Sequence, residues 1–212
     1  MARSGFRLYA LLLTAILLSF ACGHRTRFFG ASSGGRYHDV LNRCTQERRF
    51  FGLENVEYAT FVTYRTPELR RAYVEEYADR YRLSTAEAEA LLKSELDEAT
   101  RYDVFLVSHY STDPKARRLK PESNVWRLIL STSPDPGTGM EPALVQGEPS
   151  GRDPVLGYFY PFVTPWASNY LVKFKRQEGT PSLYLDMTGV LAELRFTFQR
   201  GAEVTDGTGR LH

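Results

Sequence analysis

Histidine is the side chain that most readily exchanges protons near neutral pH, so the histidines are the first candidates for chemistry. The chain contains four of them, His24, His38, His109 and His212. His109 alone falls in a segment with a clear pattern, the expected strand 102–110 (YDVFLVSHY). Side chains alternate between the faces of a strand, so the adjacent Ser108 and His109 point apart and do not form a catalytic pair by themselves. We expect a hydrogen-bonded strand-end histidine and retain His109 as the one candidate for chemistry.

Carboxylates are the second group that could carry chemistry, since a carboxylate pair hydrolyses glycosides without a histidine. An extracytoplasmic hydrolase acting on envelope material would need Asp103, Asp186 or Glu193 to converge with His109 in a concave pocket. The many acidic residues of 66–100 have no histidine or aspartate beside them at ligand spacing. We therefore expect no metal site there, and no cofactor.

The densest group of aromatic residues lies in 155–166 (VLGYFYPFVTPW). Its two prolines disfavour a central strand, so we expect some of the rings at a sheet edge or in a loop. An exposed aromatic patch commonly marks contact with a protein, a glycan or a membrane, whereas rings that cover the core have no such role. The candidate partner-binding residues are Tyr158, Tyr160, Phe162 and Trp166.

The first residues have the anatomy of an export signal. Arg3 and Arg7 precede the apolar run 8–20 (LYALLLTAILLSF), which reaches Cys22 without a charge. This run is shorter than the roughly 20 apolar residues that cross a bilayer as a helix. We therefore expect a signal peptide, residues 1–21, rather than a permanent span.

The cysteine at the end of this run resembles the lipobox of bacterial lipoproteins, in which a leucine and two small residues precede a cysteine that is acylated. Leu18 lies four residues before Cys22 instead of three, and Phe20 stands where the motif has a small residue. The resemblance covers this motif only. It implies a lipid such as palmitate on Cys22 and a membrane-anchored protein of the cell envelope, at the outer membrane or facing the periplasm.

Two other fates of this segment stay open. Ser19 and Ala21 satisfy the small-x-small rule of ordinary signal cleavage, which predicts a secreted chain. Arg25 and Arg27 follow the apolar run, and because positive charge tends to stay on the cytoplasmic side, they are what an uncleaved signal anchor would show.

The second cysteine, Cys44, depends on the fate of the first. If Cys22 is acylated, Cys44 is left single, and an isolated cysteine is more often a small buried apolar residue than a nucleophile. If Cys22 is unmodified in an oxidising compartment, the two can form a disulfide.

Composition is that of an ordinary globular protein, with 42% hydrophobic and 25% charged residues. Without Arg3 and Arg7, basic and acidic residues are equal in number, which argues against a general nucleic-acid binder. Residues 23–53 nevertheless carry a local basic excess. We expect residues 22–53 to be a lipid-anchored basic tether.

The remaining pattern predicts a mainly β domain over residues 54–200. Strands are expected at 54–65, 102–110, 125–131, 169–175, 182–187 and 190–198, with a short edge strand at 143–146. Helix-start signals at Thr66 and Ser84 predict a helical hairpin within 66–100. The second helix is expected to bury Ala88, Leu91, Leu92, Leu96 and Ala99.

Together these elements predict an antiparallel β-sandwich of the immunoglobulin-like type with an inserted α-helical hairpin, followed by a flexible tail, 201–212. A sandwich brings no activity with it. The favoured function is a non-enzymatic binding or structural module displayed from a membrane through Cys22, with an envelope protein or polysaccharide as partner. The alternatives are the extracytoplasmic hydrolase and a secreted or signal-anchored binding protein.

Overall fold

The computed structural model describes residues 35–51, 56–119, 125–135, 138–147, 153–177, 181–190 and 192–200. All of them belong to one unit, residues 31–212. The predicted signal peptide (1–21), Cys22 and the predicted tail (201–212) lie outside the described residues.

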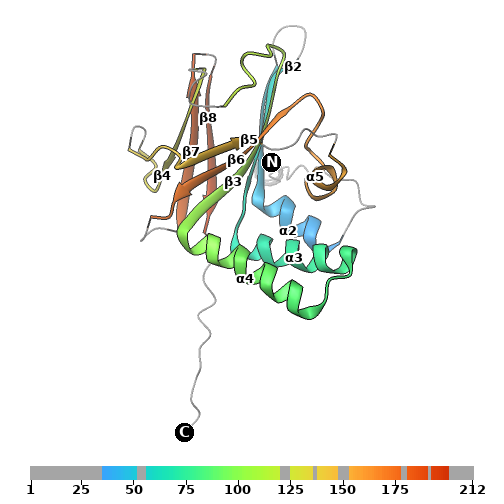
Figure 1. Cartoon of the computed structure of the whole chain (residues 1–212). Helices are drawn as coiled ribbons and strands as arrows, with labels where there is room; N and C mark the ends of the chain where they lie inside the picture. Colours follow the sequence, from blue (N-terminus) through green and yellow to red (C-terminus); the bar gives the residue numbers. More distant parts are fainter. Residues whose placement is uncertain are drawn as a thin grey trace, which may run out of the picture. The chain divides into compact units, whose positions relative to one another are not determined.

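Two antiparallel sheets form the frame of the domain (Figure 1). The five-stranded sheet has the order β1-β2-β3-β6-β5, with strands Thr45–Phe51, Val56–Tyr64, Tyr102–Ser111, Ser168–Lys175 and Leu144–Gly147. The three-stranded sheet has the order β4-β7-β8, with strands Trp126–Ser131, Ser182–Gly189 and Glu193–Gln199. The prediction of a mainly β antiparallel sandwich is confirmed, whereas its immunoglobulin-like type stays a prediction.

The core lies between the two sheets, where every second side chain of each strand points inward. Phe105, Val172 and Phe174 from the five-stranded sheet meet Leu185 and Phe196 from the three-stranded sheet, and all five are fully buried. Burying a side chain of this size stabilises the fold by roughly 1.5–3 kcal/mol. The alternation seen in the sequence is thus the source of the core.

The helices lie on the side of the five-stranded sheet that faces away from the three-stranded sheet (Figure 1). They are α2 (Arg36–Cys44), α3 (Pro67–Tyr81), α4 (Thr85–Arg101) and α5 (Pro154–Phe159). The hydroxyl of Thr66 accepts a hydrogen bond from the Leu69 amide, and Ser84 and Glu87 form a capping box. The predicted helical hairpin, α3 and α4, is therefore confirmed together with both of its start signals.

Residues 36–51 fall within the predicted tether, yet they form α2 and β1 of the folded domain. Strand β1 pairs with β2 from Thr45 opposite Thr63 to Phe51 opposite Val56. Helix α2 buries an apolar stripe at helical spacing, Tyr37, Val40, Leu41 and Cys44. Four arginines give the segment 36–51 its basic composition, and composition alone does not reveal the stripe; they are Arg36, Arg43, Arg48 and Arg49. The folded domain begins before residue 54.

Three local details also differ from the expected pattern. Asp153 and Pro154 start helix α5 inside the aromatic segment, where a loop or edge is expected. Strand β8 begins only at Glu193, and Val190 is 89% exposed. In α4 only Ala99 is buried, because the helix packs on α3 and its other predicted core positions stay half-exposed.

Candidate functional site: an apolar pocket at the open edge of the sandwich

A cavity of about 560 Å³ opens on the side of the sandwich where β4 and β5 are the edge strands of their sheets. Strand β5 has four residues and covers only half of its eight-residue neighbour β6. The pocket lies beside this short strand and is bounded by β4 and by the end of β7. The pocket is lined by Leu119, Val125, Trp126, Arg127, Leu128, Glu141, Pro142, Val145, Thr188, Gly189 and Val190.

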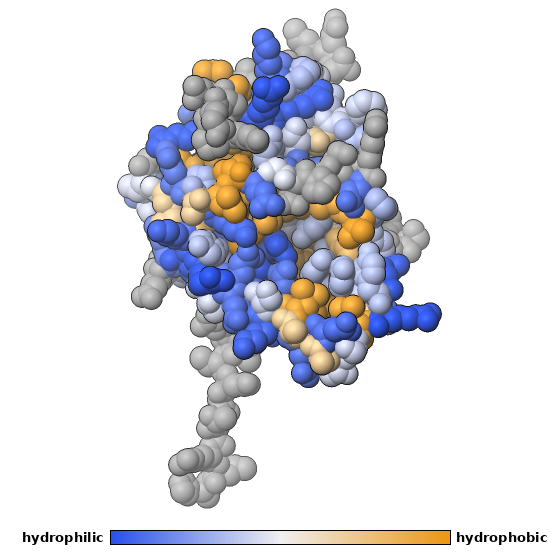
Figure 2. Space-filling view, viewed as in Figure 1, coloured by the Kyte–Doolittle hydropathy of each residue, from blue (hydrophilic) through white to orange (hydrophobic). Residues whose placement is uncertain are grey.

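The inner wall of the pocket is continuous with the hydrophobic core. Leu119, Trp126 and Leu128 are core residues, and Val125 and Val145 pack against them. The indole Nε1 of Trp126 donates a hydrogen bond to the Ala116 carbonyl at 2.7 Å, which fixes the ring. Figure 2 shows an apolar area where β5 crosses the front of the domain, with hydrophilic residues around it. An apolar ligand would meet a preformed surface here.

Polar side chains stand at the rim of the pocket. Arg127 and Glu141 form an ion pair at 2.9 Å, and both side chains are about two-thirds exposed. An ion pair in such contact with solvent stabilises the fold by less than about 1 kcal/mol. Its groups therefore remain available to a polar ligand group at little cost.

Gly189 shapes the floor of the pocket. It pairs with Trp126 across β4 and β7, and an added Cβ would lie 2.1 Å from the Val125 carbonyl oxygen. Only glycine permits this close approach of the two backbones. The resulting register places the Trp126 ring against the cavity.

His109 lies behind the Trp126 wall and is fully buried. Its Nδ1 hydrogen bonds with the Thr60 hydroxyl at 2.8 Å, and its ring meets the Trp126 ring edge-on at 5.3 Å. Burial lowers the pKa of His109 to about 4, and the nearby Arg117 acts in the same direction. The imidazole is therefore neutral at neutral pH, as a hydrogen-bonded core residue should be.

The domain is expected to lose roughly 2 kcal/mol of unfolding free energy between pH 7.5 and pH 5 because of His109. The ordinary pKa of 6.5 applies to the unfolded chain. Between about pH 6.5 and pH 4 the unfolded state thus binds more protons, and stability falls as the pH falls. Urea unfolding across this range measures the slope. His109→Gln, which can still hydrogen bond with Thr60, should flatten it; an unchanged slope would show that another group titrates.

The carboxylates that a hydrolase would need do not converge on His109. Asp103 lies at the other end of β3, where it accepts hydrogen bonds from Tyr64 and Arg200. Asp186 pairs with Arg195 at 2.7 Å on the outer face of the three-stranded sheet. Glu193 is exposed at the start of β8. The structure therefore separates the three candidate acids from His109.

The four aromatic candidates do not form one exposed patch. Tyr160 and Phe162 are buried, and Phe162 stacks on Phe61 of β2 with ring centroids 5.1 Å apart. Tyr158 is half-buried and donates a hydrogen bond to Glu76 of α3. Of the four, only Trp166 is exposed, at 65%. Helix α5 causes this split because it turns the first rings toward α3.

Cys44 carries a free thiol that is buried at the end of α2. Its Sγ lies 3.4 Å from the Thr66 hydroxyl, and burial raises its pKa. Within the described part of the chain, no group of three or more His, Cys, Asp and Glu side chains is placed to hold a metal ion. Among the described residues, no helix is long and apolar enough to span a membrane.

The sequence pattern does not predict the pocket, although one feature of the sequence is related to it. The expected edge strand at 143–146 is short, and it supplies Val145 to the pocket wall. No family model matches the chain, and searches of curated proteins and of solved structures give no match. The geometry of the pocket is therefore the main guide to function.

Proposed function

We propose that the chain is a non-enzymatic binding module of the cell envelope, anchored to a membrane by a lipid on Cys22, whose apolar pocket takes up the hydrophobic part of an amphiphile. The pocket carries this proposal. Its volume of about 560 Å³ falls in the range of about 300–1,000 Å³ that is typical of small-molecule sites.

The distribution of polar groups argues for an amphiphile rather than a polar metabolite. The walls are apolar, and the charged pair Arg127 and Glu141 stands at the rim. A ligand with an apolar chain inside and a polar end at the mouth leaves every polar group solvated or paired, which avoids the cost of burying it. Thr188 adds one hydroxyl to the lining.

Trp126 provides a direct readout of binding. The chain has two tryptophans, so Trp166→Phe leaves Trp126 as the only one, in the pocket wall. Titration of the purified Trp166→Phe chain with dodecylphosphocholine, below its critical micelle concentration, is expected to give a saturable change in Trp126 fluorescence. A linear, non-saturable response would contradict a defined site.

Two neighbouring residues of β5 give a matched pair of variants. Val145 lines the pocket, whereas Leu144 is exposed on the other face of the strand. Val145→Phe places a larger ring in the cavity wall and narrows the cavity, so it is expected to weaken dodecylphosphocholine binding by about tenfold, the equivalent of about 1.4 kcal/mol. Leu144→Phe adds an aromatic ring to the same short strand and should leave binding unchanged. Equal effects of the two variants would place the ligand elsewhere.

The anchor is tested separately from the pocket. The intact mass of the mature protein, extracted from its native membrane, is expected to include a diacylglyceryl or triacyl modification that Cys22→Ser abolishes together with membrane retention. A mass that begins at an unlipidated Cys22 would indicate plain secretion, and a full-length mass an uncleaved signal anchor. Either result would contradict the lipid anchor on Cys22 and would leave the pocket proposal unaffected.

A further inference from the structure

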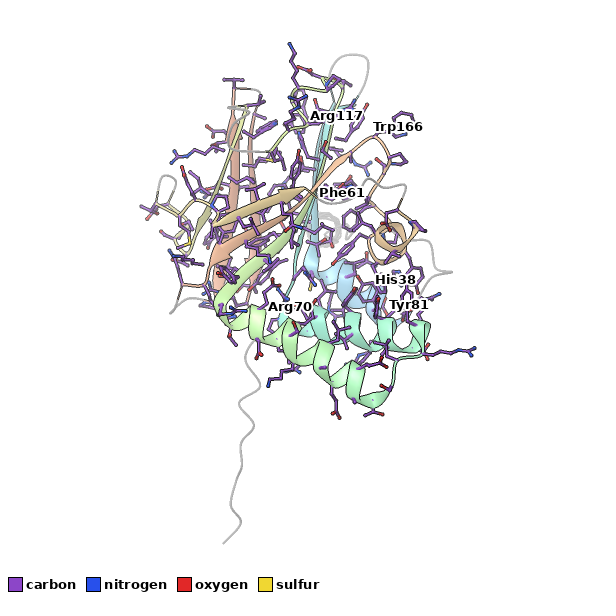
Figure 3. All side chains as sticks on the ribbon, in the orientation of Figure 1. His38, Phe61, Arg70, Tyr81, Arg117 and Trp166 are labelled. Carbon is purple, nitrogen blue, oxygen red and sulfur yellow. The ribbon has the colours of Figure 1, made fainter. Side chains whose placement is uncertain are left out.

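Three segments that are distant in sequence meet at one end of the five-stranded sheet. Tyr58 pairs with both Phe50, near the end of β1, and Ser111, the last residue of β3. His109 pairs with Ser168, the first residue of β6. The end of β1, the loop after β3 and the loop before β6 therefore share this end. Figure 3 shows Arg117 and Trp166 together here, opposite Arg70.

Two large aromatic side chains are exposed at this end. Trp166 is 65% exposed, and Phe50 is 46% exposed although it stacks on Tyr58. Tryptophan favours the boundary between water and hydrocarbon, because its ring is apolar and its N–H is polar. Exposing these rings to water alone forgoes the free energy that their burial would supply.

Basic side chains are concentrated in two segments at the same end of the sheet. Segments 47–50 and 113–118 carry five of them against the two carboxylates of Glu47 and Asp113, namely Arg48, Arg49, Lys115, Arg117 and Arg118. Arg49 lies over the Phe61 ring at 5.9 Å and Arg117 over the Tyr110 ring at 5.3 Å. Arg117 Nε also donates a hydrogen bond to the Ser111 carbonyl at 2.6 Å. Arg49 and Arg117 are thus held in place at this end by neighbouring rings.

We propose that this end of the domain, called the docking end, binds the surface of a bilayer that contains anionic phospholipid. Each basic residue near such a surface contributes about 1 kcal/mol of attraction, and exposed Trp166 can enter the interface between head groups and acyl chains. Net positive charge combined with exposed aromatic rings matches an anionic membrane better than it matches a neutral glycan.

Docking also positions the pocket. Leu119 of the pocket wall directly follows the basic residues of 115–118, and Trp126 lies beside His109 near the same end of the sheet. A domain docked in this way has its pocket close to the bilayer from which an amphiphile would come. The docking end goes beyond the proposed function, because it needs neither a ligand in the pocket nor a lipid on Cys22.

The test uses the full chain reconstituted in vesicles that contain brominated phosphatidylcholine, with or without phosphatidylglycerol. Bromine quenches tryptophan at close range, so quenching of Trp166 reports docking whatever holds the N-terminal segment. Quenching in excess of that of the Trp166→Phe chain is expected with phosphatidylglycerol and should decline at high salt. Absence of this excess would overturn the proposal and point to a protein or glycan partner.

A charge-matched control is available at the other end of the domain. Lys115→Gln with Arg118→Gln removes two exposed charges from the docking end, and Arg71→Gln with Lys93→Gln removes two from α3 and α4. The first pair is expected to lower the equilibrium constant for docking by roughly 30-fold. The second pair is expected to leave this constant nearly unchanged. Equal losses of docking in the two double variants would mean that the net charge of the domain, and not this surface, holds it on the membrane. Both double variants should bind dodecylphosphocholine as the unchanged chain does, so this titration tests the pocket separately from the docking end.

Discussion

Replacing Arg70 with methionine is expected to lower the free energy of unfolding by about 3 kcal/mol, because it removes one member of a buried ion network. The Arg70 side chain is fully buried between α3, α4 and the end of β2. Its Nη1 donates to Glu98 at 2.8 Å and to the Glu95 carboxylate at 2.5 Å, and its Nε donates to the Arg65 carbonyl.

The remaining members of the network explain why the expected loss is not larger. Arg65 still holds Glu95 through two hydrogen bonds of 2.9 Å, and Lys173 of β6 still holds Glu98 at 2.6 Å. Burial opposes ionisation of Glu98, yet Lys173 and Arg70 keep its pKa below the usual value. Without Arg70 that carboxylate is stabilised by one cation instead of two.

The adjacent residue is a suitable control. Arg71 is exposed on α3, and Arg71→Met should change stability by no more than about 0.5 kcal/mol. Guanidinium unfolding followed by circular dichroism measures both variants. If the two replacements cost the same, the network does not hold the helical hairpin on the sheet, and apolar packing alone does so.

This network shows the limit of what the sequence predicts here. Helix α4 is predicted correctly from its capping box, but the ion pairs of Glu95 and Glu98 are not predicted. Their partners come from β2, α3 and β6, and Lys173 lies 75 residues from Glu98. The capping box spans four residues, Ser84 to Glu87, and can be recognised locally, whereas an ion network depends on which surfaces the fold brings together.

The same contrast, between features that local sequence predicts and features that depend on the whole fold, applies to the strands and the pocket. Alternating apolar residues predict β3, β4, β6 and most of β8, because the two-residue period is visible within each strand. The sequence predicts the short edge strand at 143–146, which is β5, but it does not predict that β4 is the edge of the other sheet on the same side, where the pocket lies. The aromatic residues of 158–166 are recognisable as a group, but only the fold decides that Phe162 is buried and Trp166 is exposed.

Replacing Asp103 with asparagine is also expected to cost about 3 kcal/mol, because it leaves a buried guanidinium without its counter-charge. The Asp103 side chain is fully buried, and that of Arg200 is 9% exposed. Arg200 Nη2 lies 2.5 Å from Asp103 Oδ2, and the Tyr64 hydroxyl donates to Oδ1 at 2.7 Å. Asparagine keeps the shape and an acceptor for Tyr64, so the lost charge is the main change.

The pair joins the two sheets at the end opposite to His109. Asp103 belongs to β3, while Arg200 directly follows β8 and also donates to the Gln177 carbonyl beyond β6. Asp97→Asn is the control, since Asp97 is exposed near the end of α4 and only its backbone carbonyl is used there. Asp103→Asn should lower the unfolding midpoint in guanidinium, and Asp97→Asn should not. If both midpoints stay unchanged, the ion pair is dispensable, and the interdigitated side chains of the core are enough to hold the two sheets together.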